Sequence, residues 1–90
     1  MTRDELATAS DHLDTAAAET GDDAASDRLG DLAGQLSKLA DADRGPDHGR
    51  LARIQSALND LKTGDAADVT DSIEAANDAI NEYRSDLDGV

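Results

Sequence analysis

The sequence predicts an all-α protein, and three observations support this prediction. Apolar residues recur at intervals of three and four along most of the 90 residues, which is the period of an α-helix. No segment alternates apolar and polar residues, so no strand is predicted. Glycine, proline and capping residues fall between the apolar stripes, where helices have to end. A chain of this length makes one domain, and we expect residues 1–90 to form a single helical unit.

Four apolar stripes define the four expected helices, which cover residues 3–20, 23–42, 48–62 and 66–87. The stripes contain Leu6, Ala9, Leu13, Ala16 and Thr20; Leu29, Leu32, Leu36 and Leu39; Leu51, Ile54, Leu58 and Leu61; and Val69, Ile73, Ala76, Ile80, Tyr83 and Leu87. Such spacings favour nearly parallel axes, and short turns make consecutive helices antiparallel. The predicted architecture is therefore an up-down antiparallel four-helix bundle.

An alternative architecture follows from the first helix, whose only large apolar side chains are Leu6 and Leu13. Helices two to four would then form a three-helix core, with the first helix docked loosely or exchanged onto another chain. The chain lacks Phe and Trp, and the burial of alanines contributes little transfer free energy per residue. A partner chain would help to complete such a thin core.

The first expected helix starts at a pair of residues that suits a capping box. In this motif the Thr2 hydroxyl and the Glu5 carboxylate each accept a hydrogen bond from a backbone amide of the first turn. The least helical stretch is 43–47, which contains a glycine and a proline.

Two Thr-Gly-Asp runs, at 20–22 and 63–65, mark two further helix boundaries. In the first run, Gly21 suits a left-handed position that ends one helix, and Asp22 or Asp23 suits the cap of the next. The second run repeats this pattern, with Asp68 three residues after its cap.

The charge of the chain is extreme, with a formal net value of −13. Aspartate outnumbers glutamate by 17 to 4, and lysine occurs twice against six arginines. At molar salt the Debye length is about 3 Å, so this charge density is tolerated, whereas in dilute buffer it destabilises the compact state. We interpret the composition as an adaptation to a salty cytoplasm, with non-specific cations around the acidic surface. The alternative, an ordinary acidic mesophilic protein, would not explain the scarcity of lysine.

The sequence also bears on location. No apolar run approaches the roughly 20 residues of a membrane span, and the first residues form no apolar signal region. There is no cysteine, which excludes disulfides and thiolate chemistry. We expect a cytoplasmic protein that does not engage a membrane.

None of the common motifs for catalysis or cofactor binding occurs in the chain. HExxH, GxSxG, phosphate-binding and dinucleotide-binding motifs are all missing. The stretch 41–52 resembles a calcium loop but lacks the glycine at its sixth position and the glutamate at its twelfth. His12 and His48 have no partner histidine at helical spacing, and the acids lie between the apolar stripes, as on a solvated face. We therefore expect no enzyme activity, no cofactor and no specific metal site.

A local reversal of charge occurs in the third expected helix and just before it. Within ten residues that contain a single acid lie Arg44, His48, Arg50 and Arg53. Arginine near a helix N-terminus opposes the helix dipole, so helix formation does not explain Arg50. The patch predicts contact with an anion, a nucleic acid or an acidic partner. The competing interpretation is an internal clamp of arginines on nearby aspartates, since a chain of charge −13 repels nucleic acid.

A ridge of small residues lies within the second expected helix and consists of Ser26, Gly30, Ala33, Gly34 and Ser37. Two glycines inside a helix cost about 1 kcal/mol each relative to alanine. Close approach by another helix would offset this cost, which makes the ridge a candidate interface. The competing interpretation is a general reduction of surface bulk in a salt-adapted protein.

In its acidic bias, its four capped helices and its short length, the whole chain resembles the short uncharacterised helical proteins of haloarchaea that are grouped as a domain of unknown function. The resemblance implies a helical fold and a cytoplasmic haloarchaeal origin. It carries over no catalytic residue, cofactor or partner.

Two functions follow as competing hypotheses. The first is a non-catalytic helical interaction module that binds a second copy of itself, as a homodimer, or another protein. The thin core and the small-residue ridge favour it. The alternative is a nucleic-acid-associated regulatory protein that uses Arg44, Arg50 and Arg53, which the lack of aromatic residues suited to stack on bases disfavours.

Overall fold

The structure is a computed structural model, which describes residues 3–42 and 48–88, with residues 86–88 described by their backbone alone. Its elements are α1 (Asp4–Glu19), α2 (Asp23–Asp41), α3 (His48–Lys62), a short 3₁₀ helix η1 (Ala67–Val69) and α4 (Thr70–Asp88). The described residues contain no strand. Each helix begins and ends within a few residues of its predicted limits, so the all-α prediction is confirmed.

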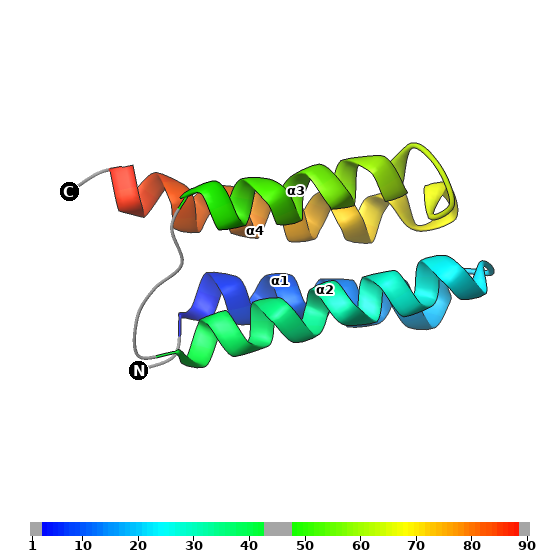
Figure 1. Ribbon diagram of the computed structural model, residues 1–90, viewed down its shortest axis with the longest axis horizontal. Coiled ribbons are helices and arrows are strands. Elements are labelled where there is room, and N and C mark those ends of the chain that lie inside the picture. The colour runs from blue at the N-terminus through cyan, green and yellow to red at the C-terminus, as the bar shows by residue number, and fades with distance from the viewer. Residues whose placement is uncertain (1–2, 43–47, 89–90) are drawn as a thin grey trace.

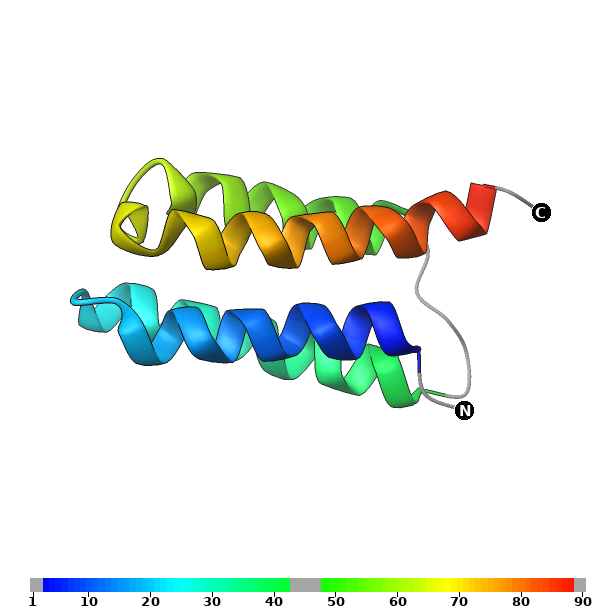
Figure 2. The same ribbon diagram turned by 180° about the vertical axis from the view of Figure 1, so that it is seen from behind.

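The helices form an up-down bundle with two layers (Figures 1 and 2). α1 and α2 make one layer, α3 and α4 make the other, and consecutive helices run in opposite directions. Between the layers, α1 packs on α4 and α2 faces α3. Each helix contributes its apolar stripe to one shared core, whose largest buried side chains are Leu6, Leu13, Leu29, Leu32, Leu36, Leu51, Leu58, Ile73 and Ile80.

α1 packs closely on both α2 and α4, although it has the fewest large side chains. Its buried face consists of Leu6, Ala9, Ser10, Leu13 and Ala16. Small residues let α1 approach α2, and hydroxyl groups then bond across the contact. Ser10 Oγ donates to Ala33 O at 2.8 Å, and Ser26 Oγ donates to Ala17 O at 2.7 Å. The alternative of a loosely docked first helix is therefore wrong, because alanines in close contact gain the dispersion energy that a count of large side chains misses.

The start of α1 departs from the predicted capping box. Arg3 occupies the position before the helix, and its side chain does not cap it. Thr2, the predicted cap, lies outside the described residues, and Glu5 is the second helical residue instead of the third. Arg3 binds the end of α2 instead, with its amide and guanidinium donating over 2.7–3.1 Å to the carbonyl oxygens of Leu39, Ala40 and Ala42. Its Nε also donates to Tyr83 Oη at 3.2 Å, so one side chain joins the starts and ends of three helices.

The two Thr-Gly-Asp turns differ from each other. Asp22 caps α2 as predicted, because its carboxylate accepts a hydrogen bond from Ala25 N at 2.8 Å. The predicted left-handed conformation of Gly21 is wrong, since none of the described residues has a positive φ. After α3 the chain enters η1 without a side-chain cap. Asp68 was expected to act near this second turn. Its carboxylate instead accepts hydrogen bonds from Gly21 N and Thr20 Oγ1 of the first Thr-Gly-Asp turn.

Candidate partner-binding groove

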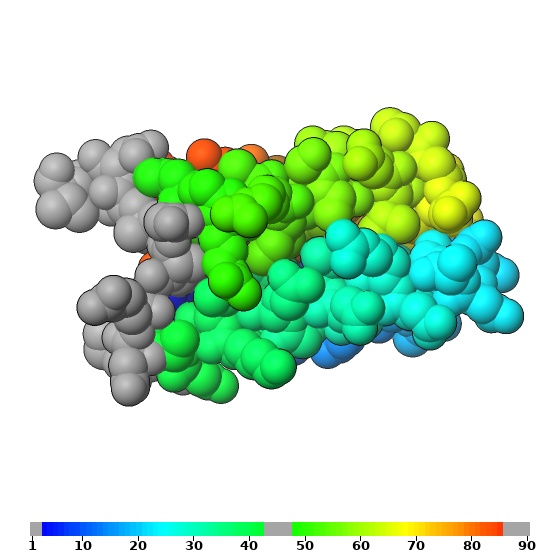
Figure 3. Space-filling view, viewed as in Figure 1, coloured from blue at the N-terminus to red at the C-terminus, as the bar shows by residue number. Residues whose placement is uncertain are grey.

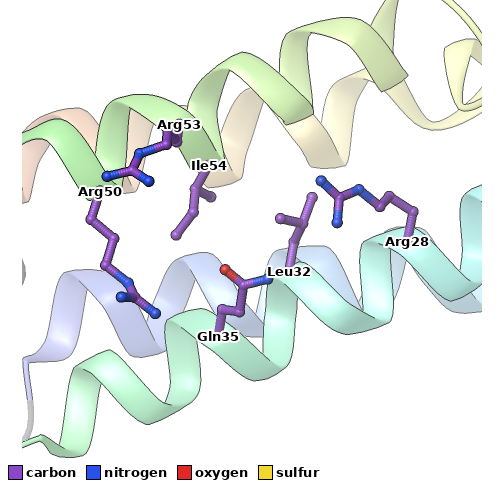
Figure 4. Close-up of a pocket in the computed structure, with 6 residues that line it drawn as sticks. All are labelled: Arg28, Leu32, Gln35, Arg50, Arg53 and Ile54. Carbon is purple, nitrogen blue, oxygen red and sulfur yellow. The ribbon is translucent and has the colours of Figure 1, made fainter.

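A groove of about 260 Å³ runs between α2 and α3, which approach each other less closely than α1 approaches its neighbours. Positions 28, 32 and 35 follow one side of α2 at helical spacing, and positions 50, 53 and 54 follow the facing side of α3. The lining of this α2–α3 groove is Arg28, Leu32, Gln35, Arg50, Arg53 and Ile54 (Figure 4). α2 and α3 lie side by side on the face shown in Figure 3.

The groove has an apolar floor and a cationic rim. Leu32 and Ile54 point toward each other between the helices and are only 2% and 3% exposed. The three arginines are exposed. Arg28 extends from α2 toward α3, and Arg50 extends from α3 toward α2 (Figure 4). Three exposed guanidinium groups around two almost fully buried apolar side chains suit a ligand that carries carboxylates.

Two of these arginines are not held by ion pairs inside the chain. Among the described residues, the side chains of Arg28 and Arg53 have neither a hydrogen-bond nor an ion-pair partner. Arg50 already has an interaction partner. The internal clamp considered for the charge-reversed patch therefore does not describe Arg53. Positive charge at Arg28 and Arg53 remains available to a ligand in a protein that is otherwise strongly acidic.

The groove continues toward the end of α3. A second hollow of about 280 Å³ shares Arg28 with the first and is otherwise lined by Ala57, Asp60, Leu61, Gly64 and Asp65. The surface between α2 and α3 thus changes from cationic, at Arg50 and Arg53, to anionic, at Asp60 and Asp65. We call the two hollows together the α2–α3 strip.

The structure separates the residues of the predicted cationic patch. Arg44 lies outside the described residues. His48 does not line the groove, because it belongs to the opposite side of α3, where Arg84 Nε donates to His48 Nδ1 at 3.0 Å. The imidazole therefore helps to hold α3 on α4. Arg50 and Arg53 are the two predicted members that the fold brings into the groove.

Arg28 and Gln35 belong to the site but were not predicted from the sequence. They lie on α2, remote in the sequence from the charge-reversed patch. The available signal was their helical spacing around Leu32, which places positions 28, 32 and 35 on one side of the helix. That spacing alone does not reveal which neighbouring helix the side faces.

The predicted ridge of small residues is divided between the inside and the surface of the bundle. Ala33 is buried, and its carbonyl accepts from Ser10 of α1. Ser26 also bonds to α1. The other three members, Gly30, Gly34 and Ser37, are exposed. A Cβ at either glycine would meet nothing within 4 Å, so their role in a contact between chains stays a prediction.

A polar seam joins α3 to α4 on the other side of α3. Gln55 Nε2 donates to Asn81 Oδ1 at 2.9 Å, and Arg84 Nη1 donates to Gln55 Oε1 at 2.7 Å. Lys62 Nζ lies 3.8 Å from Glu74 Oε1. Because these groups bond to one another, the seam contributes to bundle assembly and offers fewer unpaired charges than the α2–α3 groove.

Comparison with known families matches nearly the whole chain to a family model. The model of a family described as "Family of unknown function (DUF7553)" matches residues 1–86. The chain belongs to this family. No curated protein and no solved structure matches this DUF7553 chain.

Two further findings concern the described part of the DUF7553 chain. No helix within it combines the length and hydropathy that a bilayer span requires. Within the same residues, no three His, Cys, Asp or Glu side chains are grouped as a metal site requires.

Proposed function

We propose that this DUF7553 chain is a non-catalytic protein–protein interaction module whose contact surface is the α2–α3 groove. The observation that supports this most is the presence of three exposed arginines around one groove in a chain of net charge −13. Arginine combines planar, multidentate hydrogen bonding with weak hydration, which suits it to interfaces. The partner segment that fits best is an amphipathic helix with apolar residues along one side and carboxylates beside them.

We further propose that the module works in the salty cytoplasm of a haloarchaeon. The support is compositional: aspartate in place of glutamate, few lysines, and an excess of negative charge. Raising KCl in dilute buffer should then increase the helical circular dichroism steeply, because salt screens the self-repulsion of the folded chain. Full helicity in dilute buffer without added salt would contradict this part of the proposal.

The alternative function, nucleic-acid association, uses some of the same arginines. Arg28 adds a cation that the sequence patch did not include. The net charge of −13 still repels a phosphate backbone, and the affinity from phosphate contacts falls steeply with salt. We therefore treat nucleic-acid binding as an outcome of the test below.

A single-cysteine label provides that test, because the natural chain has no cysteine. An environment-sensitive dye is attached to Gln35→Cys in the groove, and to Ala18→Cys at an exposed position of α1 as the control. Each labelled chain is titrated with unlabelled chain, with an acidic amphipathic helical peptide, and with a short DNA duplex, in KCl that gives full helicity.

The proposal predicts saturable fluorescence change at position 35 with the unlabelled chain or the peptide, little change at position 18, and no change with DNA. Arg28→Ser together with Arg53→Ser should weaken the response. A response to DNA alone would favour the nucleic-acid function, and no response to any of the three ligands would reject the interaction module.

A further inference from the structure

We propose that the partner in the α2–α3 groove is a second copy of this chain, packed antiparallel across a two-fold axis near Ala57. This inference rests on the proposed function and specifies the partner of the same surface. It follows from the order of charges along the α2–α3 strip, from the small side chain at its middle, and from the size of the face.

The strip is a surface where two copies can meet without strong repulsion. Its three arginines and two aspartates give a formal charge of +1, which leaves −14 for the rest of a chain whose total is −13. A two-fold contact brings the same patch of both copies together. Contact through the strip therefore keeps the acidic surfaces of the two copies apart, whereas contact between acidic faces would bring like charges together.

The charges along α3 are arranged almost symmetrically about Ala57, with opposite signs on the two sides. Arg53 lies four residues before Ala57, and Asp60 lies three residues after it. Arg50 lies seven residues before, and Asp65 lies eight residues after, in the turn that follows the helix. For Arg53 and Asp60, which both lie on α3, one residue of offset corresponds to about 1.5 Å along the helix, which side chains accommodate.

A two-fold rotation at Ala57 therefore matches both pairs at once. Arg53 of each copy comes opposite Asp60 of the other copy, and Arg50 comes opposite Asp65. Arg28 lines the same hollow as Asp60, so its positive charge lies near a carboxylate close to the axis. The symmetry doubles every contact, because each pair forms in both directions.

The middle of the strip is shaped for close approach. Ala57 and Leu61 are half-buried, and the methyl side chain of Ala57 leaves space for the opposing helix at the axis. The bundle measures 39 × 20 × 17 Å, and its broad side, which carries α2 and α3 in Figure 1, is 39 by 20 Å. A contact that uses most of this side would bury the roughly 800 Å² that each partner buries in a standard interface.

Exchanging the charges of Arg53 and Asp60 tests the proposed register of the two copies. Sedimentation velocity of the full chain, at the lowest KCl concentration that gives full helicity by circular dichroism, measures dimerisation. Arg53→Asp and Asp60→Arg should each weaken it by at least about tenfold, because each replaces two attractive contacts with two repulsive ones. An equimolar mixture of these two variants should form a heterodimer, and the double variant Arg53→Asp/Asp60→Arg should dimerise again.

Matched control variants separate the effect of the register on dimerisation from the effects of net charge and of unfolding. Asp14→Arg makes the same charge change as Asp60→Arg at an exposed position of α1, and Ala18→Asp adds a negative charge to the same helix, outside the strip; both should leave dimerisation within about twofold of the natural chain. Circular dichroism of every variant checks that the bundle is intact. Loss of dimerisation only in the two strip variants, with recovery in the mixture, is the expected result.

Several results would overturn the inference. A natural chain that stays monomeric at high micromolar concentration, or strip variants that dimerise as the natural chain does, would reject the second copy as the partner. A monomeric chain whose label at position 35 still responds to the acidic peptide would reject the second copy and retain the interaction module. A monomeric chain with no response to any ligand would reject both.

Discussion

The carboxylate of Asp68 accepts a hydrogen bond from the backbone amide of Gly21 over 2.8 Å, although 47 residues separate them. Its other oxygen accepts from Thr20 Oγ1, also at 2.8 Å. The two bonds join η1 to the turn between α1 and α2, at the end of the bundle where both turns lie (Figure 1). They connect the two layers at their ends, beyond the apolar core.

Replacing Asp68 should therefore loosen this end of the bundle. Asp68→Asn keeps the shape of the side chain but removes its negative charge, so the bond from the amide of Gly21 is no longer charge-assisted and Thr20 Oγ1 has to accept instead of donate. We expect a lower Tm by circular dichroism than for Asp78→Asn, an equivalent change at an exposed position of α4. Equal Tm values for the two variants would show that the link between the turns does not stabilise the fold.

The same carboxylate should make stability depend on pH. The pKa of Asp68 lies below its ordinary value of 3.8, because the amide of Gly21 and the hydroxyl of Thr20 donate to its charged form. Its contribution to stability is complete above that ordinary value and is lost as pH falls through the lowered value. Urea unfolding from about pH 6 downward should show that the stability difference between the natural chain and Asp68→Asn shrinks below about pH 4. A difference that grows in acid would contradict this assignment.

The close packing of α1 predicts that a larger side chain destabilises the bundle at a buried alanine of this helix but not at an exposed one. Ala9 is fully buried, whereas Ala18 is exposed on the same helix. Ala9→Leu should destabilise the bundle by about 2 kcal/mol, because there is no space for three extra carbon atoms in a close helix contact. Ala18→Leu should change the free energy of unfolding by less than about 0.5 kcal/mol. Similar values in urea unfolding would indicate that α1 docks loosely after all.

The positions of the helices could be predicted because apolar spacing and turn residues act locally. How closely each helix packs in the bundle could not be predicted. The number of large side chains made α1 look weak, although its alanines Ala9 and Ala16 are fully buried in the core. Asp68 and Arg3 were missed in their actual roles because each bonds to a residue far away in the sequence. Two arginines of the groove, Arg50 and Arg53, were predicted because they are neighbours in the sequence. Arg28 was not predicted, because only the packing of α2 beside α3 brings it to the groove.

The exposed glycines of α2 provide a test that separates the groove from the ridge. Alanine at Gly30 or Gly34 meets no neighbour within 4 Å. Each substitution should therefore stabilise the fold by about 0.5–1 kcal/mol in urea unfolding through helix propensity. If the groove is the contact surface, both variants should dimerise like the natural chain. Weaker dimerisation would favour the ridge as the interface.

Gly64→Ala gives the opposite expectation for stability. Its new Cβ would lie 3.0 Å from Asp60 O, which is too close without a shift of the backbone. This variant should therefore have a lower Tm than the natural chain, and a higher Tm would contradict the geometry of the turn after α3.

Methyl NMR of the natural chain at increasing concentration tests the central claim most directly, because it reports on each side of the bundle separately. If the α2–α3 groove is the surface through which the chain binds its own copy, the largest shifts should occur at the methyl groups of Ala57 and Leu61, which are half-buried in the strip. The methyl groups of Thr8 and Ala18, exposed on α1 away from the groove, should stay constant. Shifts centred on Thr8 and Ala18, with Ala57 and Leu61 unchanged, would contradict the account.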